Sequence, residues 1–266
     1  MNNNIITVNN LSYKKILDDI SFKIQKGSFV SISGSNNCGK TTLIKILSGL
    51  ISVNNMVLFD NTNLESINKT KLFLEEGVVI LNEHINFLFN TVREEIMFVL
   101  DNIKIDDDLK LDRYNSVIRL LNLKKYQNQD PNTLNRNEKI LVLLAIAIIH
   151  KPKILYLDDI DSMMSKRDRE NIMRILHYLN KQEKMTIVMA TTNLDMALDT
   201  DYLYILNDGR IALSGLPLDI LKDDNIINKL GLRIPFMVDL SVKLRDYDLV
   251  NDIILDKERL VDTLWK

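Results

Sequence analysis

Short runs of apolar and β-branched residues recur along the chain and predict eight β-strands. These runs cover residues 5–8, 20–24, 29–33, 56–59, 78–81, 154–157, 186–190 and 202–205. Longer segments with apolar residues at helical spacing predict helices over residues 40–48, 92–102, 114–121, 139–150 and 167–179. Because strands and helices alternate in this way, we expect an α/β core with a largely parallel sheet.

Two regions depart from this alternation. Residues from about 82 to 151 carry helical patterns without a convincing strand, so we expect a helical subdomain inserted into the sheet domain. After Gly215 the pattern predicts only helices, interrupted by Gly231 and Pro235. The expected organisation is a main domain over residues 1–215 followed by a C-terminal helical extension over residues 216–266.

The composition suits a globular protein without a membrane span of its own. The chain has 266 residues, of which 46% are hydrophobic, and its 34 Lys and Arg balance 36 Asp and Glu. No basic excess attracts nucleic acid or anionic lipid, so we expect no nucleic-acid partner. The longest apolar run, Ile140–Ile149, is about half of the roughly 20 residues that span a bilayer, and it predicts a buried helix. The start of the chain lacks a secretory signal and Cys38 is the only cysteine, so we expect a cytosolic protein.

The most specific motif is the segment Gly34–Thr41, which fits the pattern G-x-x-x-x-G-K-[ST] between a predicted strand and a predicted helix. Such a loop turns its backbone N–H groups toward phosphate at a helix N-terminus. Lys40 is expected to reach the β- and γ-phosphates, and the Thr41 hydroxyl to ligate Mg²⁺. Asn37 tolerates left-handed backbone angles better than most residues, so the loop is expected to close. The predicted nucleotide-binding residues here are Gly34, Ser35, Asn36, Asn37, Cys38, Gly39, Lys40, Thr41 and Thr42.

A second motif is the apolar run Ile154–Leu157, which ends in Asp158 and Asp159. Alone, such a run is more often a strand that leads into a solvated turn. Together with the phosphate loop it indicates a Mg²⁺ site, in which Asp158 holds the metal through its water shell.

With these two motifs the chain resembles the ABC ATPases, and specifically the ATP-binding subunits of energy-coupling factor transporters, which drive uptake of vitamins and metal ions. The resemblance covers nearly the whole length and implies a P-loop NTPase fold of the ABC-ATPase type. Tyr13–Phe22 is similar to the family segment whose aromatic side chain stacks on adenine, which places Tyr13 there. Thr91–Phe98 is similar to a family helix near the surface that contacts the membrane subunit. Leu230–Met237 and Leu260–Trp265 are similar to the C-terminal extension of energy-coupling factor ATPases.

The departures from the family pattern fall at positions that serve hydrolysis. The Q-loop glutamine aligns with Leu81, or with Asn82 after a shift of one residue. The LSGGQ signature corresponds to Leu134–Glu138, which lacks both glycines, and Ser162–Ser165 lacks the D-loop aspartate. Glycines there let backbone N–H groups approach phosphate closely.

Two further departures affect the attacking water. Asp159 stands where the family has its catalytic glutamate, and it is the predicted catalytic residue. Aspartate is shorter than glutamate by one methylene group, and a displacement of the carboxylate by about 1 Å can lower the rate roughly 10²-fold. Thr192 stands at the position of the switch histidine, and loss of one such donor costs on the order of 10²- to 10³-fold. We therefore expect retained ATP binding and slow hydrolysis.

Three functional interpretations follow. The first is the ATP-binding subunit of an energy-coupling factor importer, which couples ATP binding and hydrolysis to uptake of a vitamin or metal ion. The second is a catalytically weak nucleotide-binding subunit paired with an active ATPase. The third, a soluble ABC ATPase outside transport, predicts coiled-coil insertions or tandem cassettes, and the sequence has neither.

The resemblance also implies the assembly. The expected partners are a second ABC ATPase subunit in a heterodimer, an energy-coupling transmembrane subunit and a substrate-binding membrane subunit. The expected cofactors are ATP and Mg²⁺. The expected location is peripheral, on the cytoplasmic face of the cell membrane.

Overall fold

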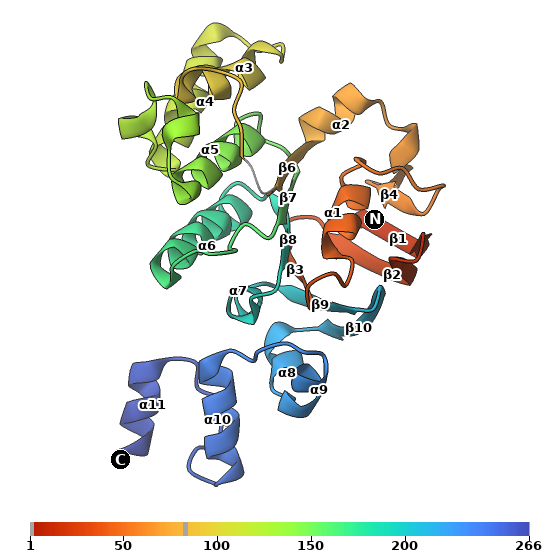
Figure 1. The fold of residues 1–266 in the computed structure, drawn as a ribbon, viewed down its shortest axis with the longest axis vertical. Coiled ribbons are helices and arrows are strands. Elements are labelled where there is room, and N and C mark those ends of the chain that lie inside the picture. Colours follow the sequence, from red (N-terminus) through yellow and green to blue (C-terminus); the bar gives the residue numbers. More distant parts are fainter. Residues whose placement is uncertain (1–2, 82–84, 266) are drawn as a thin grey trace.

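The computed structural model describes residues 3–81 and 85–265, which form two β-sheets with helices packed around them (Figure 1). The larger sheet has six strands in the order β10-β9-β3-β8-β7-β6. Its strands are β3 (Phe29–Ser33), β6 (Glu76–Ile80), β7 (Ile154–Asp158), β8 (Thr186–Thr191), β9 (Tyr202–Asn207) and β10 (Arg210–Gly215). All neighbouring pairs are parallel except β9 and β10, so the predicted largely parallel sheet is confirmed.

The smaller sheet is antiparallel and has the order β2-β1-β4-β5. Its strands are β1 (Asn4–Tyr13), β2 (Leu17–Gln25), β4 (Val57–Phe59) and β5 (Thr62–Asn63). The eight predicted strands are all present in the two sheets. The pattern missed β5, which has only two residues, and β10, whose side chains lie on an exposed sheet edge.

Helix α1 (Lys40–Leu47) lies between the two sheets (Figure 1). Its residues Ile44 and Leu47 share one buried cluster with Ile6 of the smaller sheet and Ile32 of the larger sheet. The phosphate-loop segment leads directly into α1. The packing of α1 against both sheets therefore also holds the end of this segment in place. Helix α2 (Lys69–Glu75), which the sequence pattern did not predict, follows the smaller sheet and buries only Leu72.

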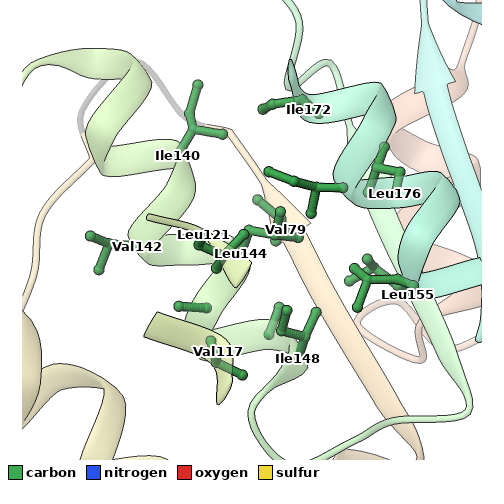
Figure 2. Packing of buried hydrophobic residues seen from close by; sticks show 14 of the residues in the cluster. Val79, Val117, Leu121, Ile140, Val142, Leu144, Ile148, Leu155, Ile172 and Leu176 are labelled. Carbon is green, nitrogen blue, oxygen red and sulfur yellow. The ribbon is translucent and has the colours of Figure 1, made fainter. Parts of the chain in front are cut away.

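The opposite face of the larger sheet is covered by α5 (Arg136–Ile148) and α6 (Lys166–Lys181), with α3 (Val92–Asp101) and α4 (Asp107–Leu120) beyond α5 (Figure 1). In Figure 2, Leu144 and Ile148 of α5 and Leu176 of α6 surround Val79 of β6 and Leu155 of β7. The apolar run that predicted a buried helix is α5. Within the described ranges, no helix has the length and apolar character needed to cross a membrane.

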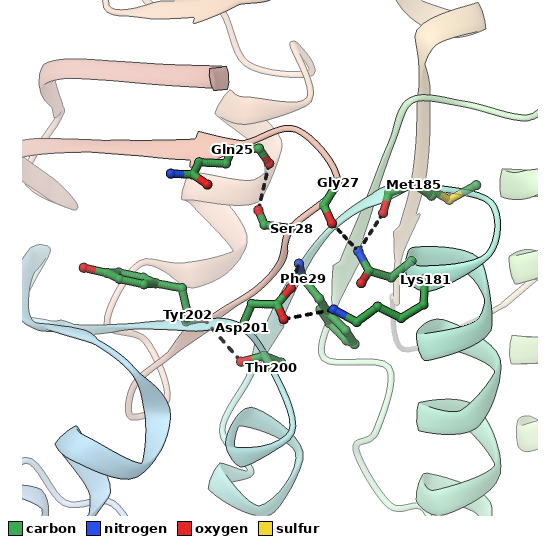
Figure 3. Close-up of polar contacts among 10 residues, drawn as sticks. Gln25, Gly27, Ser28, Phe29, Lys181, Met185, Thr200, Asp201 and Tyr202 are labelled. Atoms are coloured by element: carbon green, nitrogen blue, oxygen red, sulfur yellow. Dashed lines mark hydrogen bonds and ion pairs between the residues drawn. The ribbon is translucent and has the colours of Figure 1, made fainter. Parts of the chain in front are cut away.

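Polar contacts fix the amino ends of β3 and β8 to the last turn of α6 (Figure 3). The Asn180 amide donates to the carbonyl oxygens of Gly27 at 2.8 Å and Met185 at 2.9 Å. The Asp201 carboxylate accepts from the Phe29 N–H at 2.8 Å and pairs with the Lys181 ammonium at 3.0 Å. The carboxyl ends of these parallel strands, where the sequence motifs lie, are at the opposite edge of the sheet.

After β10 the chain is helical, as the sequence pattern predicted (Figure 1). The helices are α8 (Pro217–Leu221), α9 (Asp224–Lys229), α10 (Phe236–Asp246) and α11 (Lys257–Leu264), while the short α7 (Leu194–Leu198) precedes β9. The Ser241 hydroxyl in α10 donates to the Ile254 carbonyl at 2.7 Å, which holds the segment before α11 against α10. Trp265 follows α11 and is 86% exposed. The boundaries at residues 82, 151 and 215 stay predictions.

Candidate functional site

A cavity of about 580 Å³ lies where the two sequence motifs meet, at the carboxyl ends of β3 and β7. It brings together most of the predicted loop residues, the two consecutive aspartates and Thr192. The lining residues are Ile16, Asn36, Asn37, Gly39, Lys40, Thr41, Thr42, Asp158, Asp159 and Thr192. Six predicted loop residues thus share one cavity with the two aspartates, although the two motifs lie more than a hundred residues apart.

The loop between β3 and α1 has the backbone that its glycines require. A Cβ atom at Gly34 would lie 2.2 Å from the Leu206 carbonyl oxygen, so no side chain fits there. Gly39 has φ 108° and precedes the first turn of α1. Asn37 has φ 64°, so the expected left-handed conformation is confirmed. The residues at the start of α1, Lys40 to Thr42, line the cavity, and the N-terminus of a helix favours an anion.

Lys40 is held inside this loop and is 8% exposed. Its ammonium group donates to the carbonyl oxygens of Gly34 at 2.9 Å and Ser35 at 2.8 Å. The Cys38 sulfur lies 3.9 Å from the same nitrogen, and burial raises the pKa of the Cys38 thiol. Cys38 therefore stays a neutral thiol at neutral pH.

Asp158 lies at the end of β7 and is 3% exposed. Burial raises the pKa of its carboxyl group, and a hydrogen bond with Thr41 opposes this rise. Its Oδ1 atom is buried and has no hydrogen-bond partner among the described residues. A buried carboxylate oxygen in this position favours a nearby cation, and oxygen ligands are those that Mg²⁺ prefers. The pair of Asp158 and Thr41 therefore fits the predicted metal site.

Asp159 and Thr192 lie on the same side of the cavity. The Asp159 N–H donates to the Ala190 carbonyl at 3.0 Å, and its φ of 52° turns the chain sharply after β7. Behind them, the Thr191 hydroxyl contacts the buried carboxylate of Asp161. This contact, which the sequence did not indicate, ties the segment after β7 to the end of β8.

Three predicted nucleotide-binding residues of the loop region and Tyr13 do not line this cavity. Gly34 and Cys38 belong to the loop but do not line the cavity, and Ser35 lines a neighbouring cavity. Tyr13 lies at the end of β1, packed against the core between the sheets, and its stacking on adenine stays a prediction. Ile16 lines the cavity instead, and nothing in the sequence singles it out.

The signature-like segment Leu134–Glu138 lies apart from the cavity of its own chain. Asn135 begins α5 as its N-cap and accepts from the Glu138 N–H, while the Glu138 carboxylate accepts from the Asn135 N–H at 3.1 Å. The Tyr126 hydroxyl also donates to Glu138. The Glu138 charge is therefore engaged within the cap. Leu81 packs against the core beside α5, and Asn82 lies outside the described residues.

Comparisons with known proteins agree with this geometry. The family model described as ABC transporter matches residues 17–162. Energy-coupling factor transporter ATP-binding protein EcfA of Pediococcus pentosaceus is 31% identical over 242 residues, which cover 88% of this chain and 86% of that protein. EcfA1 of Listeria monocytogenes is 28% identical over 255 residues, covering 95% and 91% of the two chains.

A solved structure has the same architecture. CbiO1 from Clostridium perfringens, described as part of the ABC transporter complex cbiONQ, superposes with a TM-score of 0.77 at 25% identity. The match covers 90% of this chain and 98% of that one. It confirms the fold class predicted from the sequence, a P-loop NTPase fold of the ABC-ATPase type.

Proposed function

The chain belongs to the ABC transporter family of ATP-binding proteins, in its energy-coupling factor group, and we propose that it binds Mg-ATP to power an importer. This membership confirms the resemblance found in the sequence. An ABC ATPase domain binds ATP, and this chain is an ATP-binding subunit of the energy-coupling factor type. The proposal adds the metal, the direction of transport and the class of cargo, a vitamin or a metal ion.

The arrangement of Lys40 and Asp158 around one cavity carries the proposal. Lys40 supplies a buried ammonium group at the phosphate loop, and Asp158 with Thr41 supplies oxygen ligands in the same cavity. When bound, Mg²⁺ neutralises charge on the β- and γ-phosphates. The first turn of α1 orients the phosphates through its N–H groups, with Thr42 in that turn.

A second candidate function is a catalytically weak subunit, and the residues beside the phosphate site favour it. Asp159 is shorter than glutamate by one methylene group, and Thr192 carries no ionisable group to polarise water. In a two-chain sandwich, each site combines one chain's phosphate loop with the other chain's signature segment. A heterodimer with an active ATPase subunit would therefore supply the faster site.

The proposed docking surface for the transmembrane subunit is an apolar groove of about 400 Å³ between α1, α2, α3 and α5. Leu50 and Phe73 line it and are exposed, and Val99 of α3 lies on its far side. Helix α3 overlaps the segment Thr91–Phe98, which resembles the family helix near the membrane subunit, and Val99 follows directly after this segment. Docking there would place the chain peripherally on the cytoplasmic face of the membrane, with a substrate-binding membrane subunit in the same complex.

The test is Mg-ATP binding and steady-state hydrolysis, measured for the chain alone and then with a candidate ATPase partner. Lys40→Ala is the control, because it removes the ammonium group from the loop and should abolish binding. We expect binding by the chain alone and turnover that rises when the partner is added. Brisk hydrolysis by the chain alone, as an ATP-driven homodimer, would refute the weak-subunit proposal.

A further inference from the structure

The cavity of about 580 Å³ at the phosphate loop is called the nucleotide cavity below. A second cavity, of about 450 Å³, adjoins it on the side of the C-terminal extension. The two cavities share Asn36 of the phosphate loop and Thr192. The residues of the extension that line the second cavity are Gly231, Leu232, Arg233, Ile234 and Phe236. A segment about two hundred residues downstream of the phosphate loop therefore lies beside it.

The position of Arg233 is fixed by its neighbours in the chain. Gly231, with φ 70°, reverses the chain after α9, and the Leu232 N–H donates to the Ile227 carbonyl at 3.3 Å. Leu232 is buried in one cluster with Leu194 of α7, which begins two residues after Thr192. Pro235 is also buried and is the N-cap of α10. Arg233 thus lies between two buried residues, and its side chain is exposed to the cavity.

Beside the Mg²⁺ that Asp158 and Thr41 would hold, the described side chains of the nucleotide cavity supply a single positive charge for a triphosphate. Among the described residues that line it, Lys40 is the one cation, while Asp158 and Asp159 add negative charge. Thr192, at the position of the family's histidine, adds none. Arg233 takes part in no ion pair or hydrogen bond within residues 3–81 and 85–265. The acidic residue that shares its cavity is Asp195, in the first turn of α7.

We propose that Arg233 of the C-terminal extension contacts the terminal phosphate of ATP. Asn36 and Thr192 mark the end of the nucleotide cavity that faces the extension, on the side of Asp159. A guanidinium group is permanently charged and presents a planar fork of donors that matches phosphate oxygens. The extension thereby supplies from the same chain the cationic donor that Thr192 cannot supply. This assignment rests on the proposed function, because it needs ATP in the cavity.

The contact makes the site selective for the triphosphate, because ADP lacks the phosphate that Arg233 contacts. Loss of a hydrogen bond to a charged group costs about 1.5–3 kcal/mol, or roughly ten- to a hundredfold in affinity. Removing the guanidinium should therefore weaken binding of ATP by this factor and leave ADP binding unchanged. A purely structural role, such as attraction of Arg233 to Asp195, would alter both nucleotides equally.

The experiment measures dissociation constants of the full chain for Mg-ATP and Mg-ADP by titration calorimetry. Arg233→Gln is the test variant, and Arg233→Lys should recover part of the lost ATP affinity. Lys229→Gln is the control variant, because it removes an exposed cation of the same extension that does not line the cavity. It should retain the ratio of ATP to ADP affinity found in the unmodified chain. Thermal unfolding of each variant checks that the extension stays folded.

Equal ATP affinity in Arg233→Gln and the unmodified chain would overturn the assignment, as would an equal loss for both nucleotides. Lys40→Ala separates this result from failure of the proposed function. If Lys40→Ala loses both nucleotides while Arg233→Gln binds normally, ATP binding stands and the Arg233 contact is wrong. If the unmodified chain binds neither nucleotide, both proposals fail.

Discussion

The hydroxyl group of Thr191 lies 2.9 and 3.0 Å from the two carboxylate oxygens of Asp161 and donates to this carboxylate. Both residues are buried, and burial raises the pKa of Asp161 while the Thr191 hydroxyl lowers it. The contact joins the end of β8 to the turn after β7. It therefore fixes Thr192 and Asp159, which line the nucleotide cavity, relative to each other.

Thr191→Val should destabilise the protein, because it keeps the side-chain shape but removes a side-chain donor from the buried Asp161 carboxylate and the acceptor of the Asn193 N–H. The expected loss in the free energy of unfolding is about 1–3 kcal/mol. Urea unfolding at neutral pH measures it. Thr133→Val is the matched control, since the Thr133 hydroxyl bonds a carbonyl at the surface and its loss should cost much less. Equal stability of the two variants would contradict this account.

Glu76 should make stability depend on pH. It begins β6 with a buried side chain, and burial together with the nearby Glu75 raises the pKa of Glu76 to about 8. Its folded pKa is above the unfolded value of 4.5, so the folded state favours the protonated carboxyl. The stability that this group contributes is therefore complete below about pH 4.5 and is lost as pH rises through about 8.

Glu76→Gln keeps the shape of the protonated side chain and cannot ionise. The free energy of unfolding of this variant, minus that of the unmodified chain, should grow between pH 5 and pH 8 and reach a few kcal/mol. Denaturant unfolding across this range measures the difference. A flat difference for Glu76→Gln would refute the raised pKa.

The length of the side chain at position 159 should limit hydrolysis. Asp159→Glu extends the carboxylate by one methylene toward the water beside the phosphate, so we expect turnover to rise by roughly tenfold or more. Asp159→Asn should abolish the remaining turnover, with ATP affinity changed little in either variant because Lys40 and Asp158 are intact. Steady-state hydrolysis and titration calorimetry measure the two effects. If Asp159→Asn retains full turnover, Asp159 is not the catalytic carboxylate.

Leu50 should matter for assembly and not for nucleotide binding. It follows α1, is 62% exposed and lines the apolar groove proposed for the transmembrane subunit. Leu50→Glu places a charge in this groove, so it should weaken recruitment of the chain to vesicles that contain the transmembrane subunit. Leu216→Glu, at an exposed leucine before α8, is the matched control. Equal recruitment of the two variants, with unchanged Mg-ATP binding, would place the docking surface elsewhere.

The sequence predicted the central strands because they are buried on both faces. Every residue of β3, β7 and β8 is buried, so each reads as a continuous apolar or β-branched run ending at a site motif. Strand β10 alternates exposed and half-buried side chains on the sheet edge, and α2 buries a single residue, so neither gives a strong pattern. Burial on one side only is the common reason why these elements were missed.

The site was predictable where its residues are adjacent in sequence. The phosphate loop and the two aspartates each form a short contiguous motif, so the sequence of the motif alone indicates its chemistry. Ile16 and Arg233 reach the same region through the fold, from the turn before β2 and from the extension. Their neighbours in sequence carry no phosphate-binding pattern, so only the three-dimensional arrangement brings them to the loop.

The exposed position of Trp265 determines what the intrinsic fluorescence of this protein reports. The sequence has one tryptophan, and it lies at the end of the extension, remote in the chain from both sheets. Its emission should therefore already resemble that of a solvated indole in the folded chain and change little when the ATP-binding core unfolds. A blue shift of the Trp265 emission would instead indicate that another subunit covers α11. Tryptophan fluorescence of the unmodified chain should therefore report assembly.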